Sequence, residues 1–133
     1  MTNSARGTFD VKLVPQDDNT GDSSLGRMTI EKRFHGDIEG TSRGQMLTAG
    51  TEVKGSAGYV AIEKVTGRLH GRSGTFVLQH SGTMRQGDPE LSISVVPDSG
   101  TGELVGVTGR FEIAIASDGT HSYELEYTLG EAP

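Results

Sequence analysis

The chain has 133 residues, a length that fits one domain with a modest hydrophobic core, so we expect a single domain over residues 1–133. Its 18 acidic and 12 basic residues give a formal net charge of −6 with no basic run, so a nucleic-acid partner is not expected. The absence of cysteine excludes disulfides, thiolate metal sites and a thiol nucleophile.

Glycine interrupts the chain 20 times, which makes long helices hard to place. The longest stretch without glycine, residues 8–20, contains Pro15 followed by a polar turn sequence. No twenty-residue apolar stretch occurs, and the N-terminal residues lack the apolar core of a secretory signal. We therefore expect no membrane span and a cytoplasmic location.

Eight segments show the alternation of apolar and polar residues that is typical of half-buried strands. In chain order they are residues 8–14, 27–34, 37–49, 59–66, 75–84, 90–97, 110–117 and 121–129. The connections 35–37, 85–89 and 117–120 contain the glycine or aspartate of tight turns, which predicts antiparallel neighbours. A longer acidic loop is expected after Val14, and one short helical turn is expected around Glu103.

The segments near the two ends of the chain separate apolar from polar residues most clearly. In residues 8–14, for example, Phe9, Val11 and Leu13 lie on one face of the expected strand and Asp10 lies on the other. Without helices to cover the apolar face, eight strands must stack as a sandwich or close into a barrel, and closure removes exposed edges. We expect an all-β fold, an eight-stranded antiparallel barrel, whose interior either fills with side chains or holds one small ligand.

Residues 27–50, 55–84 and 91–109 resemble a bacterial family known as domain of unknown function 3224 (DUF3224). The resemblance implies a small calycin-type barrel similar to that of allene oxide cyclase, frequent homo-oligomers and no agreed biochemical activity. Plant allene oxide cyclases close an unstable epoxide inside an apolar barrel with a glutamate, without a metal or organic cofactor. That reaction applies to this chain only as an analogy of fold.

Glu63 and His80 lie on otherwise apolar faces of two consecutive predicted strands. If Val65 lies opposite Phe76 in an antiparallel hairpin, Glu63 lies diagonally from His80 on one surface. A carboxylate and an imidazole in that arrangement can shuttle a proton, which makes Glu63 and His80 the candidate catalytic residues. A register shifted by one residue would turn Ile62 inward and leave Glu63 in water, and the sequence leaves both registers open.

Further polar or aromatic side chains on apolar faces are candidate ligand contacts. A lysine buried there needs a carboxylate partner, for which Glu63 is a candidate, whereas a lysine near the rim extends its ammonium into water; the rim position is favoured. Tyrosines in such positions either pack with a satisfied hydroxyl or orient a ligand carbonyl. The candidate ligand-binding residues are Lys32, Tyr59, Phe76, Tyr123 and Tyr127.

Several alternative kinds of site find little support. The histidines at 35, 70, 80 and 121 form no short-spaced ligand pair, so no metal site is expected. The glycines of residues 100–106 have the wrong spacing for a nucleotide fingerprint and lead toward a strand. Ser81 follows His80 directly, so the two side chains point to opposite faces of a strand and cannot cooperate as in a hydrolase triad.

The leading hypothesis is a small-molecule barrel, a cofactor-free cyclase or isomerase acting on a largely apolar substrate in the lumen. One alternative is a non-catalytic carrier or sensor of a hydrophobic small molecule, and another is a packed structural or interaction module. We also expect a homo-oligomer, formed through an outer sheet face that bears Val60, Ile62 or Val96.

Overall fold

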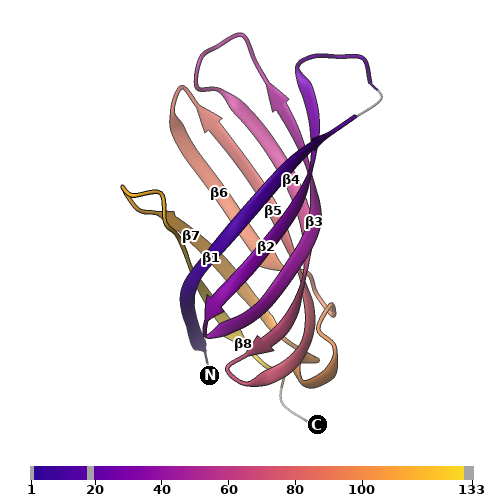
Figure 1. Cartoon of the computed structure of the whole chain (residues 1–133), viewed down its shortest axis with the longest axis vertical. Helices are drawn as coiled ribbons and strands as arrows, with labels where there is room; N and C mark the ends of the chain where they lie inside the picture. Colours follow the sequence, from indigo (N-terminus) through magenta and orange to yellow (C-terminus); the bar gives the residue numbers. More distant parts are fainter. Residues whose placement is uncertain (1, 18–19, 131–133) are drawn as a thin grey trace.

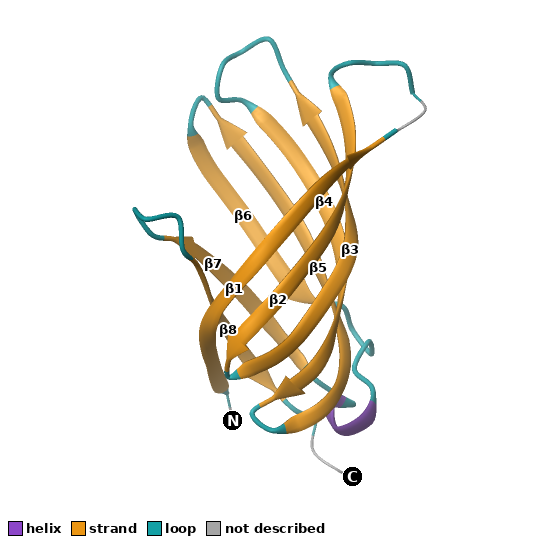
Figure 2. Ribbon diagram, viewed as in Figure 1, coloured by secondary structure: helices purple, strands orange, loops and turns teal. Residues whose placement is uncertain are grey.

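The computed structural model describes residues 2–17 and 20–130 as eight antiparallel strands and one short 3₁₀ turn (Figures 1 and 2). The strands follow one another around a closed barrel in chain order, with β8 returning to pair with β1. The elements are β1 (Asn3–Gln16), β2 (Leu25–Gly36), β3 (Ile38–Gly50), β4 (Ala57–Leu69), β5 (Arg72–Arg85), β6 (Asp88–Val95), η1 (Gly102–Leu104), β7 (Thr108–Ile115) and β8 (His121–Thr128). The predicted fold class and the helical turn beside Glu103 are confirmed.

Several strands are longer than the alternation pattern suggested. β1 begins at Asn3, because residues 3–9 pair with β8, a long-range contact that no local pattern reveals. β4 and β5 are joined by only His70 and Gly71, which have φ angles of 48° and 78°. Two successive residues with positive φ form the turn type that matches the twist of a tight hairpin.

The interior is packed at the end of the barrel that carries the β2–β3 and β4–β5 turns. A core cluster fills this end, and it contains all four phenylalanines together with Tyr123 and Tyr127. The connection from β6 to β7 folds underneath, where Leu104 and Val107 are each only 1% exposed. We call this part the closed half, because side chains and the η1 connection fill it.

The opposite end of the barrel, beside the β3–β4 and β5–β6 connections, is open. β8 pairs with β1 only as far as Phe9, and within the described residues β6 pairs with β7 at a single position, Ser94 with Arg110. Figures 1 and 2 show β1 and β6 continuing beyond the short β7–β8 hairpin. We call this part the open half.

Side chains at this end confirm that solvent reaches the inner wall. Leu13, Met84 and Leu91 have the same strand parity as buried core residues and therefore point inward, yet they are 45%, 43% and 44% exposed. The chain's own side chains therefore leave this end of the inner wall partly uncovered. In the described part of the chain, no helix is both long and apolar enough to cross a bilayer.

Candidate functional site

Glu63 lies inside the barrel and is completely buried. Its Oε1 atom is 2.8 Å from Nζ of Lys32 and 2.7 Å from Nε2 of His80, and its Oε2 atom accepts a 2.6 Å hydrogen bond from Oγ of Ser42. Lys32, Ser42 and His80 are themselves at most 8% exposed. A buried carboxylate is thus surrounded by three donors, the arrangement that a buried charge requires.

Four consecutive strands supply these side chains, and their register explains why they meet. Lys32 on β2 lies opposite Ser42 on β3, and His80 on β5 lies opposite Ala61 on β4. Because Glu63 is two residues from Ala61, its carboxylate lies diagonally between its partners. The pairing of Val65 with Phe76, from which Glu63 was expected to face His80, is the one observed.

Gly44 makes room for this carboxylate. It lies directly opposite Glu63, and a Cβ atom at Gly44 would be 2.6 Å from Cα of Glu63 and 2.1 Å from the carbonyl oxygen of Ile62. Those separations are far below van der Waals contact, so β3 and β4 can approach this closely only without a side chain at position 44.

We expect Gly44→Ala to lower the free energy of unfolding by about 1–3 kcal/mol, because β3 must move away from β4 and from the Glu63 carboxylate. Chemical denaturation measures the loss. Gly58→Ala is the matched control, since a Cβ there would lie at an ordinary 3.7 Å from its nearest neighbour, the carbonyl oxygen of Gly82. Equal stability of the two variants would show that the close approach at Gly44 is unimportant.

The environment keeps Glu63 ionised. Burial raises the pKa of the carboxyl group, but the hydrogen bond from His80, the charge and hydrogen bond of Lys32 and the hydrogen bond from Ser42 together outweigh burial and hold the pKa at about 2. Nζ of Lys32 also lies 4.8 Å from the ring centroid of Phe9, which adds a cation–π contact. At neutral pH the pair is therefore a buried ion pair.

His80 connects this ion pair to the open half. While Nε2 faces Glu63, Nδ1 lies 3.3 Å from the hydroxyl of Tyr59, whose side chain is half-buried. The Tyr59 ring leans over Gly82, where an added Cβ would be only 2.5 Å from Cε1 of the ring. Burial, and then the charge of Glu63, raise the pKa of Tyr59, so its hydroxyl keeps its proton and can donate.

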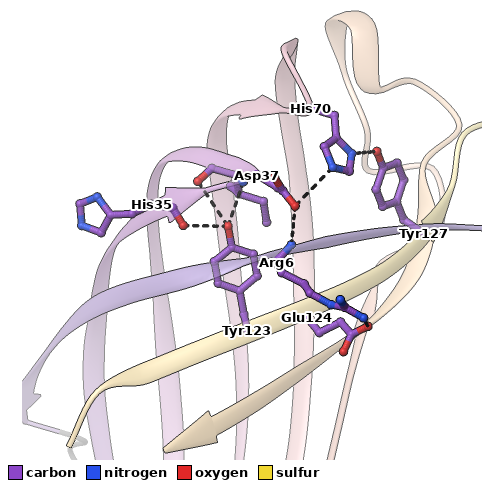
Figure 3. A network of polar contacts seen from close by, with 8 residues as sticks. Arg6, His35, Asp37, His70, Tyr123, Glu124 and Tyr127 are labelled. Carbon is purple, nitrogen blue, oxygen red and sulfur yellow. Dashed lines mark hydrogen bonds and ion pairs between the residues drawn. The ribbon is translucent and has the colours of Figure 1, made fainter. Parts of the chain in front are cut away.

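The structure separates the other predicted ligand contacts from this site. Phe76 belongs to the core cluster. The hydroxyl of Tyr123 accepts a 2.9 Å hydrogen bond from the N–H of Ile38 and donates to the carbonyl of His35 at 3.0 Å. The hydroxyl of Tyr127 contacts Nδ1 of His70 (Figure 3). Their hydroxyls are occupied in the closed half, so Tyr59 alone among the tyrosines joins Glu63 and His80.

Figure 3 shows the polar network that ties the closed half together. The Asp37 carboxylate accepts a 2.8 Å hydrogen bond from the backbone N–H of Arg6 and lies 3.4 Å from Nε2 of His70. The hydrogen bond from Arg6 is the main cause that lowers the pKa of Asp37. These contacts link β1 to the β2–β3 and β4–β5 turns, and His70 extends them to Tyr127 on β8. Because these contacts join strands and turns of the closed half, their structural role is sufficient to explain the network.

Two points of the sequence interpretation need correction or addition. The favoured rim position of Lys32 is wrong: its side chain is buried because Glu63 neutralises it inside the barrel. Ser42 was missed, although its spacing of four residues from Ile38 places both on the inward face of β3. Val60 and Ile62 are exposed on the outer face as expected, whereas Val96 follows β6 and is half-buried.

Within residues 2–17 and 20–130, no group of three or more histidine, aspartate or glutamate side chains is arranged to hold a metal ion. The donors around Glu63 are a lysine, a serine and a histidine that already satisfy the carboxylate. What the arrangement can do chemically is hold an imidazole in a fixed orientation, with its second nitrogen directed at a phenol.

Comparisons with known proteins agree with the fold and leave the chemistry open. A family model described as "Protein of unknown function (DUF3224)" matches residues 5–127. A crystal structure at 1.84 Å resolution of a protein with unknown function from the DUF3224 family, from Shewanella oneidensis MR-1, is 49% identical in sequence. The match has a TM-score of 0.93 and covers 99% of this chain and 100% of that one. A search of curated proteins finds no match.

Proposed function

The chain belongs to the DUF3224 family, and from its interior site we propose that it binds a small, largely apolar molecule in the open half of the barrel. The observation that carries the proposal is the exposure of inward-facing Leu13, Met84 and Leu91. These side chains give the inner wall an exposed apolar surface, which we call the hollow and which an apolar ligand would cover.

One member of the polar site is only half-buried, which suits a ligand with one polar group. The Tyr59 hydroxyl is the half-buried member of the polar site. It can accept from a ligand hydroxyl while it donates to Nδ1 of His80, or it can turn from Nδ1 and donate to a ligand carbonyl. Glu63, Lys32 and Ser42 lie deeper and satisfy one another. In this proposal they position His80, and Tyr59 and His80 contact the ligand.

Binding can be tested with N-phenyl-1-naphthylamine, an uncharged apolar dye that becomes fluorescent in apolar surroundings. We expect saturable binding to the purified chain and a loss of at least about tenfold in affinity for Leu91→Trp, whose indole occupies the hollow. Ser92→Trp is the matched control, because the neighbouring residue faces outward. Dye binding that is absent, or that is equal in both variants, would contradict the proposal.

A second candidate, a cofactor-independent isomerase or cyclase, is favoured by the chain of contacts from Glu63 through His80 to Tyr59. In such a reaction the Tyr59 hydroxyl turns from Nδ1 of His80 to a ligand oxygen, and Nδ1 removes a proton from one carbon of the ligand. The electron pair of the broken C–H bond moves into the π system of the ligand, and return of the proton to another carbon gives an isomer of the substrate. Glu63, ionised at neutral pH, orients the ring rather than donating a proton.

Imidazole nitrogen NMR separates the catalyst from the carrier. The catalytic candidate requires His80 to carry its hydrogen on Nε2, toward Glu63, and an unprotonated Nδ1 whose lone pair accepts from Tyr59 in the free protein. In Glu63→Gln the preference for this tautomer should weaken. A ring protonated on both nitrogens at neutral pH would remove the base and leave the non-catalytic carrier as the remaining function.

We also propose that the chain associates with a second copy through the outer face of β3 and β4. Leu47 lies opposite Val60 there, next to Ile62, and all three are about half exposed. Gln45 and Gln79, which flank Ile62, carry no charge. Two copies that each carry a net charge of −6 repel one another least where such an uncharged apolar face meets its equivalent.

Light scattering during size-exclusion chromatography tests this contact. We expect an oligomer at micromolar concentration and a monomer for Ile62→Lys, because the new charge would be buried at the contact. Thr66→Lys, which adds the same charge to an exposed position of the same strand, should leave the oligomer intact. A wild-type chain that is strictly monomeric would remove the proposal.

A further inference from the structure

The methionines that the structure describes share one region of the barrel. The three that the structure describes, Met28, Met46 and Met84, all have inward strand parity, and all lie in the open half. Met28 and Met46 lie directly opposite one another on β2 and β3, whereas Met84 lies on β5 next to the β5–β6 turn. They form part of the wall of the proposed binding hollow.

Aromatic side chains have the opposite distribution. All four phenylalanines and two of the three tyrosines belong to the core cluster of the closed half, and only Tyr59 lies outside it. Met28 and Met46 are partly buried, but they are not among the described apolar residues that pack against that cluster. The chain thus places rigid rings where it packs against itself and flexible thioethers where its wall is open.

This division has a physical consequence for recognition. Methionine is unbranched, with three rotatable side-chain bonds and a polarizable sulfur, so a methionine wall reshapes itself around ligands of different outline. Phenylalanine and β-branched side chains instead keep a fixed surface that selects one shape. A hollow made to fit one rigid substrate gains nothing from three adaptable residues in its wall.

We propose that the open half accepts apolar molecules with a single polar group across a range of shapes, both flexible chains and compact rings. The polar group contacts Tyr59 and His80, and Met28, Met46 and Met84 adjust to the hydrocarbon. The inference rests on the proposed binding function and adds the class of ligand: neutral or weakly polar amphiphiles selected by size and polarity rather than by outline.

The test compares two alcohols with eleven carbons and one hydroxyl each, linear 1-undecanol and polycyclic 1-adamantanemethanol, as competitors of the naphthylamine dye. After correction for their water–octanol partition, we expect the two affinities for the wild-type chain to agree within about tenfold. Replacing the three methionines by isoleucine, which is stiff at χ1, should increase the ratio of the two alcohol affinities at least about fivefold. The corresponding leucine variant keeps side-chain volume and flexibility closer to the original and should widen it less.

The outcomes separate this inference from the function on which it depends. If the wild-type chain binds one alcohol and excludes the other, or if the isoleucine variant leaves the ratio unchanged, the shape-tolerant wall is refuted while ligand binding stands. If neither alcohol displaces the dye and the dye itself does not bind, the binding function fails and this inference fails with it. Unchanged thermal unfolding of the variants establishes that any change in ratio belongs to the wall.

Discussion

Replacing Glu63 by Gln is expected to lower the free energy of unfolding by about 3–5 kcal/mol, which corresponds to a decrease of more than about 10 °C in Tm. The substitution changes almost no volume, but it leaves the buried ammonium of Lys32 without a counter-charge. It also replaces one of the two carboxylate oxygens by an amide NH2 group, although Oε1 accepts from Lys32 and His80 and Oε2 accepts from Ser42. Leaving one partner of a buried ion pair unpaired costs more than the intact pair contributes.

Urea denaturation measures this loss, and two further variants identify its origin. Glu126→Gln, at an exposed position on β8, should change stability by no more than about 0.5 kcal/mol. Lys32→Met combined with Glu63→Gln should recover part of the loss, because both charges leave the interior together. A decrease below about 1 kcal/mol for Glu63→Gln alone would show that Glu63 is not the centre of a buried charge cluster.

Acid is expected to remove about 3 kcal/mol of stability through this one carboxyl group. Its pKa is about 2 in the folded chain, compared with an ordinary value of 4.5. Because the folded-state pKa is the lower one, the stabilisation is fully present above pH 4.5 and is lost as the pH falls through 4.5 toward 2. The loss reflects protonation of Glu63 beside Lys32, which ends the ion pair.

Urea midpoints measured at several pH values between 5 and 2.5 should therefore fall more steeply for the wild-type chain than for Glu63→Gln. The additional loss of unfolding free energy in the wild-type chain follows from the difference between the folded and unfolded pKa values of Glu63. Exposed carboxylates such as Asp22 and Asp118, whose pKa values are lowered by hydrogen bonds from Ser24 and Thr120, are common to both chains. The two curves should converge toward acid pH, and curves that stay parallel would refute the low pKa of Glu63.

The barrel could be predicted, and the meeting of Glu63 with His80 could be predicted for one of the two registers that the sequence leaves open, because both depend on local patterns. Alternation in residues 59–66 places Glu63 on the face of Ala61 and Val65, and the short turn at His70 and Gly71 fixes which residue of β5 each of them meets. Glu63 and His80 are neighbours on adjacent strands, so a single hairpin brings them together.

Lys32 and Ser42 could be placed less well because their positions depend on the whole barrel. Lys32 on β2 reaches Glu63 on β4 across the strand between them, β3. The tilt of the strands in the closed barrel decides whether Lys32 lies deep in the interior or near the rim. Local sequence patterns also do not reveal which end of the barrel the tyrosines occupy. Tyr123 and Tyr127 lie in the closed half because β8 is short and pairs with the first residues of β1.

Methyl NMR of the chain titrated with N-phenyl-1-naphthylamine shows whether a ligand occupies the open half. We expect saturable shifts of the methyl signals of Met28, Met46 and Met84, which lie on the inward face, while the signals of Val60 and Ile62 on the outer face stay unchanged. Saturable shifts confined to Val60 and Ile62, with the three methionine signals unmoved, would contradict binding in the open half.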